Sequence, residues 1–245
     1  MSAIPDHISS PERPALGPVP PRPQRRIVFW PLWASLAGLL GFLGTIVFDV
    51  RPPAEREAWT TGEDYTVTAA DMGTLDHVAS RLGWTAGLLS VVALLIFWAV
   101  WQRATIARRS SVGARLLGAG VLITAAAALF GYGWKGALGN YLGAEAGTYD
   151  DNGVFVYYML TDFGAYMPWF GVLIGILAVV WMAFAERLVS RVLGGFSLLV
   201  ALFLSSFMFA TGVPGIPGTL APLWLIVFGI WLAVGRSPVV RQVAR

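Results

Sequence analysis

Six uncharged apolar segments dominate the hydropathy pattern of the chain. They cover residues 27–48, 83–101, 116–132, 167–185, 192–210 and 220–235. A helix needs about 20 apolar residues to cross a hydrocarbon core of ~30 Å, whereas a barrel strand would be half as long and would alternate in polarity. The pattern therefore predicts an all-α, polytopic membrane helix bundle with six transmembrane helices within residues 27–235.

The charged residues are divided between the two sets of connections. Of the 17 Lys and Arg residues, 13 lie in the N-terminal segment, the second and fourth connections and the C-terminus, whereas 11 of the 14 acidic residues lie in the first and third connections. Cytoplasmic loops of membrane proteins carry an excess of Lys and Arg. The division predicts a multi-pass protein of the cell membrane with both termini in the cytoplasm. It places the first and third connections, 49–82 and 133–166, on the extracytoplasmic side.

Composition sets the two flanking segments apart and narrows the classes of function. Residues 1–26 hold seven of the fifteen prolines, which predicts a disordered cytoplasmic tail, and residues 236–245 form a basic cytoplasmic tail. The net charge of +3 does not indicate a nucleic-acid partner, because the basic residues lie at span ends, where membrane topology requires them. The chain has no cysteine, and neither His7 nor His77 lies in an apolar segment, so no thiolate site, haem or other cofactor is expected.

The first extracytoplasmic connection contains a helix signal and a titratable residue. Thr68 and Asp71 have the spacing of a capping box, and apolar residues recur at helical spacing from Met72 to Leu82. The segment is expected to lie on the bilayer or on the bundle, or to extend the second span outward. His77 would face solvent beside Arg81. It is a candidate proton-responsive group, although a solvated surface histidine is the simpler interpretation.

The third connection supplies the other candidate site residues. Tyr149, Asp150 and Asp151 lead into Asn152-Gly153, a strong turn signal, and the two carboxylates are weak candidates for a calcium site. Residues 154–162 are expected to extend the fourth span outward, with a bend near Pro168. Asp162 and Lys135, the only lysine, would then lie at similar depth and form an ion pair, because an ionisable group at membrane depth normally needs a partner.

Three functions remain open. The favoured hypothesis is an accessory or interaction component of a membrane assembly that acts through its outer connections, with a membrane-protein partner or a second copy of the chain. The alternative is a small transporter or channel for a neutral or lipid-like solute, which would need no charge inside the spans. The third is a membrane enzyme that uses Asp150, Asp151 and Asp162 with a metal. Gly83 with Gly87, and Gly171 with Gly175, have the small-xxx-small spacing of closely packed helices.

Overall fold

A computed structural model describes residues 27–108, 110–235 and 237–240. This part of the chain is helical and contains no strand. The predicted tail 1–26 lies outside the described residues, as does most of the tail 236–245.

Five helical segments are long and apolar enough to span a membrane. They are α3 (His77–Ala104), α4 (Val112–Tyr141), the continuous α5–α6 segment (Asp151–Phe184), α7 (Arg191–Thr211) and α8 (Pro217–Val234). A shorter apolar helix, α1 (Leu32–Phe42), continues into the π-helical turn η1 (Leu43–Val47). The chain is thus built as an integral membrane protein, and the sixth crossing stays a prediction.

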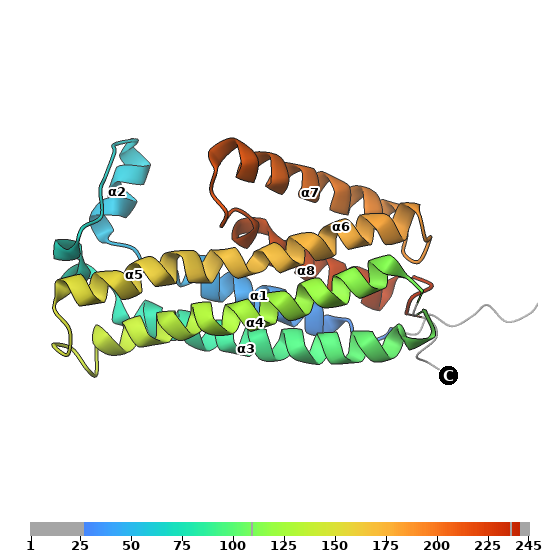
Figure 1. The fold of residues 1–245 in the computed structure, drawn as a ribbon, viewed down its shortest axis with the longest axis horizontal. Coiled ribbons are helices and arrows are strands. Elements are labelled where there is room, and N and C mark those ends of the chain that lie inside the picture. The colour runs from blue at the N-terminus through green and yellow to red at the C-terminus, as the bar shows by residue number, and fades with distance from the viewer. Residues whose placement is uncertain (1–26, 109, 236, 241–245) are drawn as a thin grey trace, which may run out of the picture.

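The helices lie along one another, with α7 at the edge (Figure 1). The α1 helix packs on α3 and α8, α4 packs on α3, α5 and α6, and α7 packs on α6 and α8. The start of α1 and the end of α8 meet at one end of the bundle, where the Val28 amide donates to the Ala233 carbonyl at 3.2 Å.

Glycines set the closest helix crossings. A Cβ at Gly120 would lie 2.2 Å from the Gly171 carbonyl oxygen, and one at Gly131 would lie 1.7 Å from that of Gly164. Without side chains at these positions, α4 approaches α5 and α6 closely, which is the use that small residues have between membrane helices. Gly171, from one of the predicted small-xxx-small pairs, thus packs inside the bundle. Gly87, from the other pair, does so as well, because a Cβ there would lie 2.2 Å from the Tyr132 ring.

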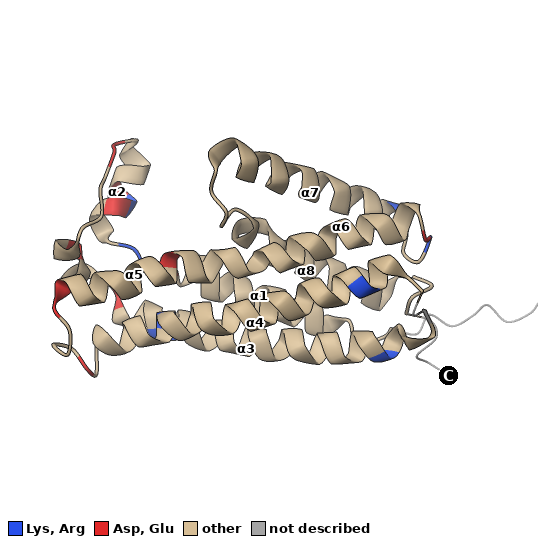
Figure 2. Ribbon diagram, viewed as in Figure 1, with Lys and Arg blue, Asp and Glu red and all other residues tan. Residues whose placement is uncertain are grey.

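The two ends of the bundle differ in charge (Figure 2). One end, here named the acidic end, carries α2 (Pro53–Thr61), the 3₁₀ helix η2 (Ala69–Thr74) and the turn before α5. The other, the basic end, carries the end of α3, the start of α4 and the connection from α6 to the start of α7, with Arg103, Arg115, Arg187 and Arg191. The residues of the two predicted extracytoplasmic connections thus gather at the same end.

The first connection confirms part of the predicted helix. The capping box of Thr68 and Asp71 is present, and it caps η2. However, Leu75 is extended and α3 begins at His77, with the Asp76 carboxylate capping its first turn. The single helix expected over 68–82 is therefore wrong, whereas α3 does begin before the predicted second span, as one of the alternatives expects.

The third connection is shorter than expected because helices enter it from both sides. The α4 helix continues nine residues beyond the predicted end at Tyr132, and α5 begins at Asp151. The turn predicted at Asp151–Gly153 is the first turn of α5 instead, capped by Asp150, which accepts from the Gly153 amide at 2.9 Å. The extension of the fourth span is confirmed, with Pro168 in the 3₁₀ turn η4 (Met167–Trp169) between α5 and α6 (Phe170–Phe184).

Candidate functional site

A half-buried arginine gathers three carboxylates at the acidic end. Arg51 donates from Nε to Asp49 at 2.8 Å and from Nη1 to Glu55 at 3.0 Å, and its Nη2 pairs with Asp162 of α5. Glu55 is placed by α2, which begins at Pro53, two residues after Arg51, and has Glu55 in its first turn. Tyr158 of α5 donates to the other Glu55 oxygen at 3.1 Å. The Arg51 cluster, as Arg51 with Asp49, Glu55 and Asp162 is named here, thus ties the first connection to α5.

The Arg51 cluster carries more negative than positive charge. Burial alone would lower the pKa of Arg51, but the Asp49 and Asp162 carboxylates raise it well above its ordinary value, so the guanidinium keeps its charge. One cation with three carboxylates leaves a formal charge of −2. Asp162 is the most exposed of the three acids, with 35% of its side chain accessible against 19% for Asp49 and 10% for Glu55.

A cavity of about 400 Å³ lies against this cluster; most of its lining is apolar, and it is named the polar cavity here because Arg51 and Asp162 lie on its wall. Arg51 and Asp162 line it together with the aromatic rings of Trp59 and Tyr166. The Trp59 ring lies over the Arg51 guanidinium, 4.9 Å from centroid to Cζ, which is the geometry of a cation–π contact. The α7–α8 hairpin closes the other side through residues 213–219, and its Gly218 packs directly on Tyr166.

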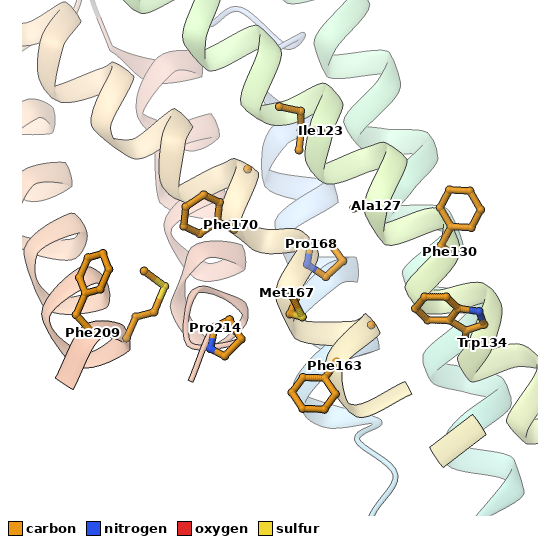
Figure 3. Close-up of a pocket in the computed structure, with 13 residues that line it drawn as sticks. Ile123, Ala127, Phe130, Trp134, Phe163, Met167, Pro168, Phe170, Phe209 and Pro214 are labelled. Carbon is orange, nitrogen blue, oxygen red and sulfur yellow. The ribbon is translucent and has the colours of Figure 1, made fainter. Parts of the chain in front are cut away.

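A lateral groove of about 770 Å³ opens on the side of the bundle (Figure 3). Met167 and Pro168 lie between the residues of α4 on one side and Phe209 and Pro214 on the other. None of the lining residues is charged. They are Ile123, Ala127, Phe130 and Trp134 of α4; Phe163, Gly164, Met167, Pro168, Phe170 and Gly171 of α5–α6; Met208 and Phe209 of α7; and Pro214.

The lateral groove and the polar cavity adjoin. Phe163 lines both, and the hairpin contributes Pro214 to the groove and its neighbours Val213 and Gly215 to the cavity. An apolar groove on the side of the bundle therefore lies next to a cavity with charged and aromatic residues at the acidic end. Both volumes are in the range of ~300–1,000 Å³ that is typical of small-molecule sites.

Lys135 has a different partner from the one predicted. It is fully buried within α4, and its Nζ donates to the Gly44 carbonyl of η1 at 2.7 Å. That carbonyl is available because η1 redirects the backbone donors: the Phe48 amide donates to Leu43 and the Asp49 amide to Ile46. The predicted Lys135–Asp162 ion pair is thus not formed, since each side chain is engaged elsewhere.

Buried hydroxyl and indole groups form further hydrogen bonds beside Lys135. The Trp169 indole donates to the Thr45 hydroxyl at 3.2 Å, and Thr45 donates to the Ala165 carbonyl at 3.2 Å. The Thr45 and Tyr132 hydroxyls also share a hydrogen bond of 2.8 Å. These bonds hold η1 against α4 and α5–α6.

The remaining predicted site residues lie apart from the Arg51 cluster. His77 is exposed at the start of α3. Tyr149 packs edge-on against Tyr141, with ring centroids 4.8 Å apart. Asp150 is an N-cap, and the Gly153 amide holds the pKa of its carboxyl below the ordinary value, while Asp151 is exposed. In the described residues, no group of three or more His, Asp and Glu side chains is arranged to hold a metal ion.

Arg51 is the residue that sequence reasoning missed. The charge distribution treats it only as one of the basic residues outside the basic segments. Its neighbours are more informative, because it stands between Asp49 and Glu55 and before two prolines. An arginine four residues before a glutamate, at the point where a proline starts a helix, is the local signal that indicates a fixed guanidinium.

No protein-family profile, curated protein or solved structure matches this chain.

Proposed function

We propose that this protein binds a lipid-like amphiphile, whose chain enters the lateral groove from the bilayer and whose head lies in the polar cavity. The observation that carries the proposal is that the two spaces adjoin: Phe163 lines both, and neighbouring residues of the α7–α8 hairpin line each of them. A site that is apolar along one part and polar at one end matches the chemistry of an amphiphile. A lipid-like ligand is also part of the alternative function that the sequence suggests, a small transporter or channel.

The environment of the groove supports entry from the bilayer. Its rim residues Phe209, Phe130 and Ile123 are 79%, 66% and 53% exposed, so the groove lies on the outward surface of the bundle. In our proposal the chain crosses the membrane six times, with the basic end in the cytoplasm, as the excess of Lys and Arg favours. The polar cavity then lies near the extracytoplasmic surface, where lipid heads are found.

The packing of the centre favours binding over conduction. Thr124 and Tyr132, two of the polar residues that could line a path through the bundle, are fully buried against neighbouring helices. A ligand that stays on the side of the bundle needs no such path. Movement of a lipid along the groove is compatible with this arrangement.

Photo-crosslinking tests the proposal. The full-length protein in nanodiscs is labelled with a long-chain alcohol that carries a diazirine on its chain, and the labelled peptides are mapped by mass spectrometry. Labels are expected on the groove residues Met208, Phe209 and Phe163. Ala127→Trp fills the groove and should remove most of this labelling, whereas Ala126→Trp, on an exposed position of the same helix outside the groove, should leave it unchanged. Equal labelling of both variants contradicts the proposal.

A second candidate is the accessory role, which one observation favours. The α7 helix packs chiefly on α6 and α8, and its apolar residues Val192, Leu199 and Phe203 are 68%, 69% and 57% exposed. Such a face can contact a partner helix within the membrane. Native mass spectrometry after purification in mild detergent separates the two candidates: a bound lipid mass favours the amphiphile, and a stoichiometric protein partner favours the accessory role.

A further inference from the structure

We infer that the amphiphile is a membrane lipid whose head carries a positively charged amine, and that Asp162 binds this amine. The inference rests on the proposed function and adds the charge of the ligand. It comes from the charge balance and the aromatic lining of the polar cavity.

The charge balance disfavours an anionic head. Among the described residues, Arg51 is the only cation that lines the polar cavity, and it already pairs with Asp49, Glu55 and Asp162. An anion would therefore meet a guanidinium that is neutralised and an excess of carboxylate. A cation finds the opposite, because the formal charge of −2 in the Arg51 cluster is reduced when an ammonium group binds.

Asp162 is the carboxylate that a ligand can reach. It lines the cavity, whereas Asp49 and Glu55 lie behind Arg51 and do not. Its side chain is also the most exposed of the three. The carboxylate accepts from Arg51 through Oδ1, and a carboxylate can accept at both of its oxygens. An ammonium beside Asp162 would thus gain a charge-assisted hydrogen bond without breaking the contact to Arg51.

The aromatic lining fits the same ligand. Trp59 and Tyr166 present ring surfaces to the cavity, and aromatic rings attract cations such as alkylammonium groups. Trp59 already makes this contact with Arg51. The ring is 63% exposed, so its environment leaves room for a second contact.

The bilayer is the source of the ligand because of the position of the groove. The hydrocarbon chain of the ligand must occupy a space bounded by α4, α5–α6 and α7, and the rim of this space faces outward from the bundle. A soluble amine without a chain would leave this apolar space unfilled, whereas a lipid fills it with its own hydrocarbon chain.

The test compares three photo-activatable probes with the same chain and different heads: a primary amine, an alcohol and a sulfate. Each is added to the full-length protein in nanodiscs of neutral lipid, and the yield of labelled groove peptides is measured over a range of probe concentrations. The amine is expected to bind about tenfold more tightly than the alcohol, which corresponds to about 1.4 kcal/mol, and the sulfate more weakly than the alcohol.

Two variants assign the preference to the cavity. Asp162→Asn should bring the amine to the affinity of the alcohol, whereas Asp151→Asn, an exposed acid on the same helix, should keep the preference. Because Asp162→Asn also removes a partner of Arg51, Trp59→Leu and Trp59→Phe give a second comparison at an exposed position. Trp59→Phe should retain most of the preference for the amine, and Trp59→Leu should reduce it.

The outcomes separate this inference from the proposed function. Labelling of the groove by all three probes with equal affinity overturns the cationic head and leaves the amphiphile site standing. Labelling of the groove by none of them overturns both. A preference for the amine that survives Asp162→Asn and Trp59→Leu places the recognition elsewhere and also overturns the inference.

Discussion

The crossing of α4 and α5 at Gly131 and Gly164 gives the sharpest test of the fold. In Gly131→Ala, the new Cβ would lie 1.7 Å from the Gly164 carbonyl oxygen and 2.4 Å from its carbonyl carbon. Carbon atoms in contact prefer separations of about 3.5–4.0 Å. The obstacle is backbone and cannot rotate away as a side chain can, so the two helices must separate.

The magnitude follows from two opposing effects. Replacement of glycine by alanine inside a helix stabilises it by about 0.5–1 kcal/mol, whereas overpacking costs about 1–3 kcal/mol and occasionally more. Because the overlap at Gly131 is with rigid backbone, we expect a net loss of about 2 kcal/mol or more in the free energy of unfolding. Gly133→Ala is the matched control: it lies two residues away on α4, a Cβ there meets nothing within 4 Å, and it should stabilise the protein by about 0.5–1 kcal/mol.

The assay is unfolding of each purified variant in mixed micelles by titration with sodium dodecyl sulfate, monitored by circular dichroism and tryptophan fluorescence. The two alanines should shift the midpoint in opposite directions. If Gly131→Ala is as stable as Gly133→Ala, the close approach of α4 and α5 is wrong, and with it the positions of Gly164 and Phe163 in the lateral groove.

Three further predictions concern charged residues. Arg51→Gln leaves three carboxylates without their cation and should destabilise the protein by roughly 2–4 kcal/mol in the same assay, whereas Arg56→Gln, at an exposed position, should cost under about 0.5 kcal/mol. Double-mutant cycles should give a coupling of about 1 kcal/mol or more between Arg51 and Asp162, and additive effects within about 0.5 kcal/mol for Lys135→Met with Asp162→Asn; strong coupling in the second cycle would restore the direct ion pair. Because the folded state lowers the pKa of Asp150, its cap stabilises the protein above the unfolded pKa of about 3.9 and is lost as the pH falls through the lower folded value, so Asp150→Ala should flatten the stability profile below about pH 4.

The sequence predicted the long elements well because their signals are local. Uncharged segments of span length, the capping box at Thr68 and Asp71, and the proline at position 168 each depend on neighbouring residues, and each has its counterpart in the structure. The ends of the elements were less accurate. The predicted third span stopped at Tyr132 because Lys135 follows, but α4 continues to Tyr141.

The error at Lys135 has a physical cause that no local pattern records. A lysine ends an apolar segment only if its charge has to reach water or a carboxylate. Here the ammonium donates to the Gly44 carbonyl, from a helix that lies 91 residues away in sequence. Space for it depends on Gly83, where a Cβ would lie 2.7 Å from Lys135 Cε. The pairing therefore depends on three helices meeting at one point.

The candidate site could be predicted only in part for the same reason. The sequence predicts Asp162 as a site residue because a carboxylate at the edge of an apolar segment is conspicuous. Similar depth in the membrane, however, indicates Lys135, the only lysine, as its partner. Arg51 lies in a connection, and it reaches Asp162 because Pro53 starts α2 and Glu55 in the first turn holds the guanidinium against α5. The partner was set by the path of the first connection, which hydropathy does not describe.

The two cations near the acidic end, Lys135 and Arg51, have different surroundings. Lys135 is fully enclosed and bonded to backbone, so it holds η1 against α4 and presents nothing to a ligand. Arg51 takes up three carboxylates but leaves Asp162 35% exposed on the wall of a cavity. Had Asp162 paired with Lys135 instead, its charge would be neutralised within the bundle. The observed pairing leaves an excess of negative charge beside a cavity that adjoins an apolar groove, and that excess is what an amphiphile with an ammonium head would recognise.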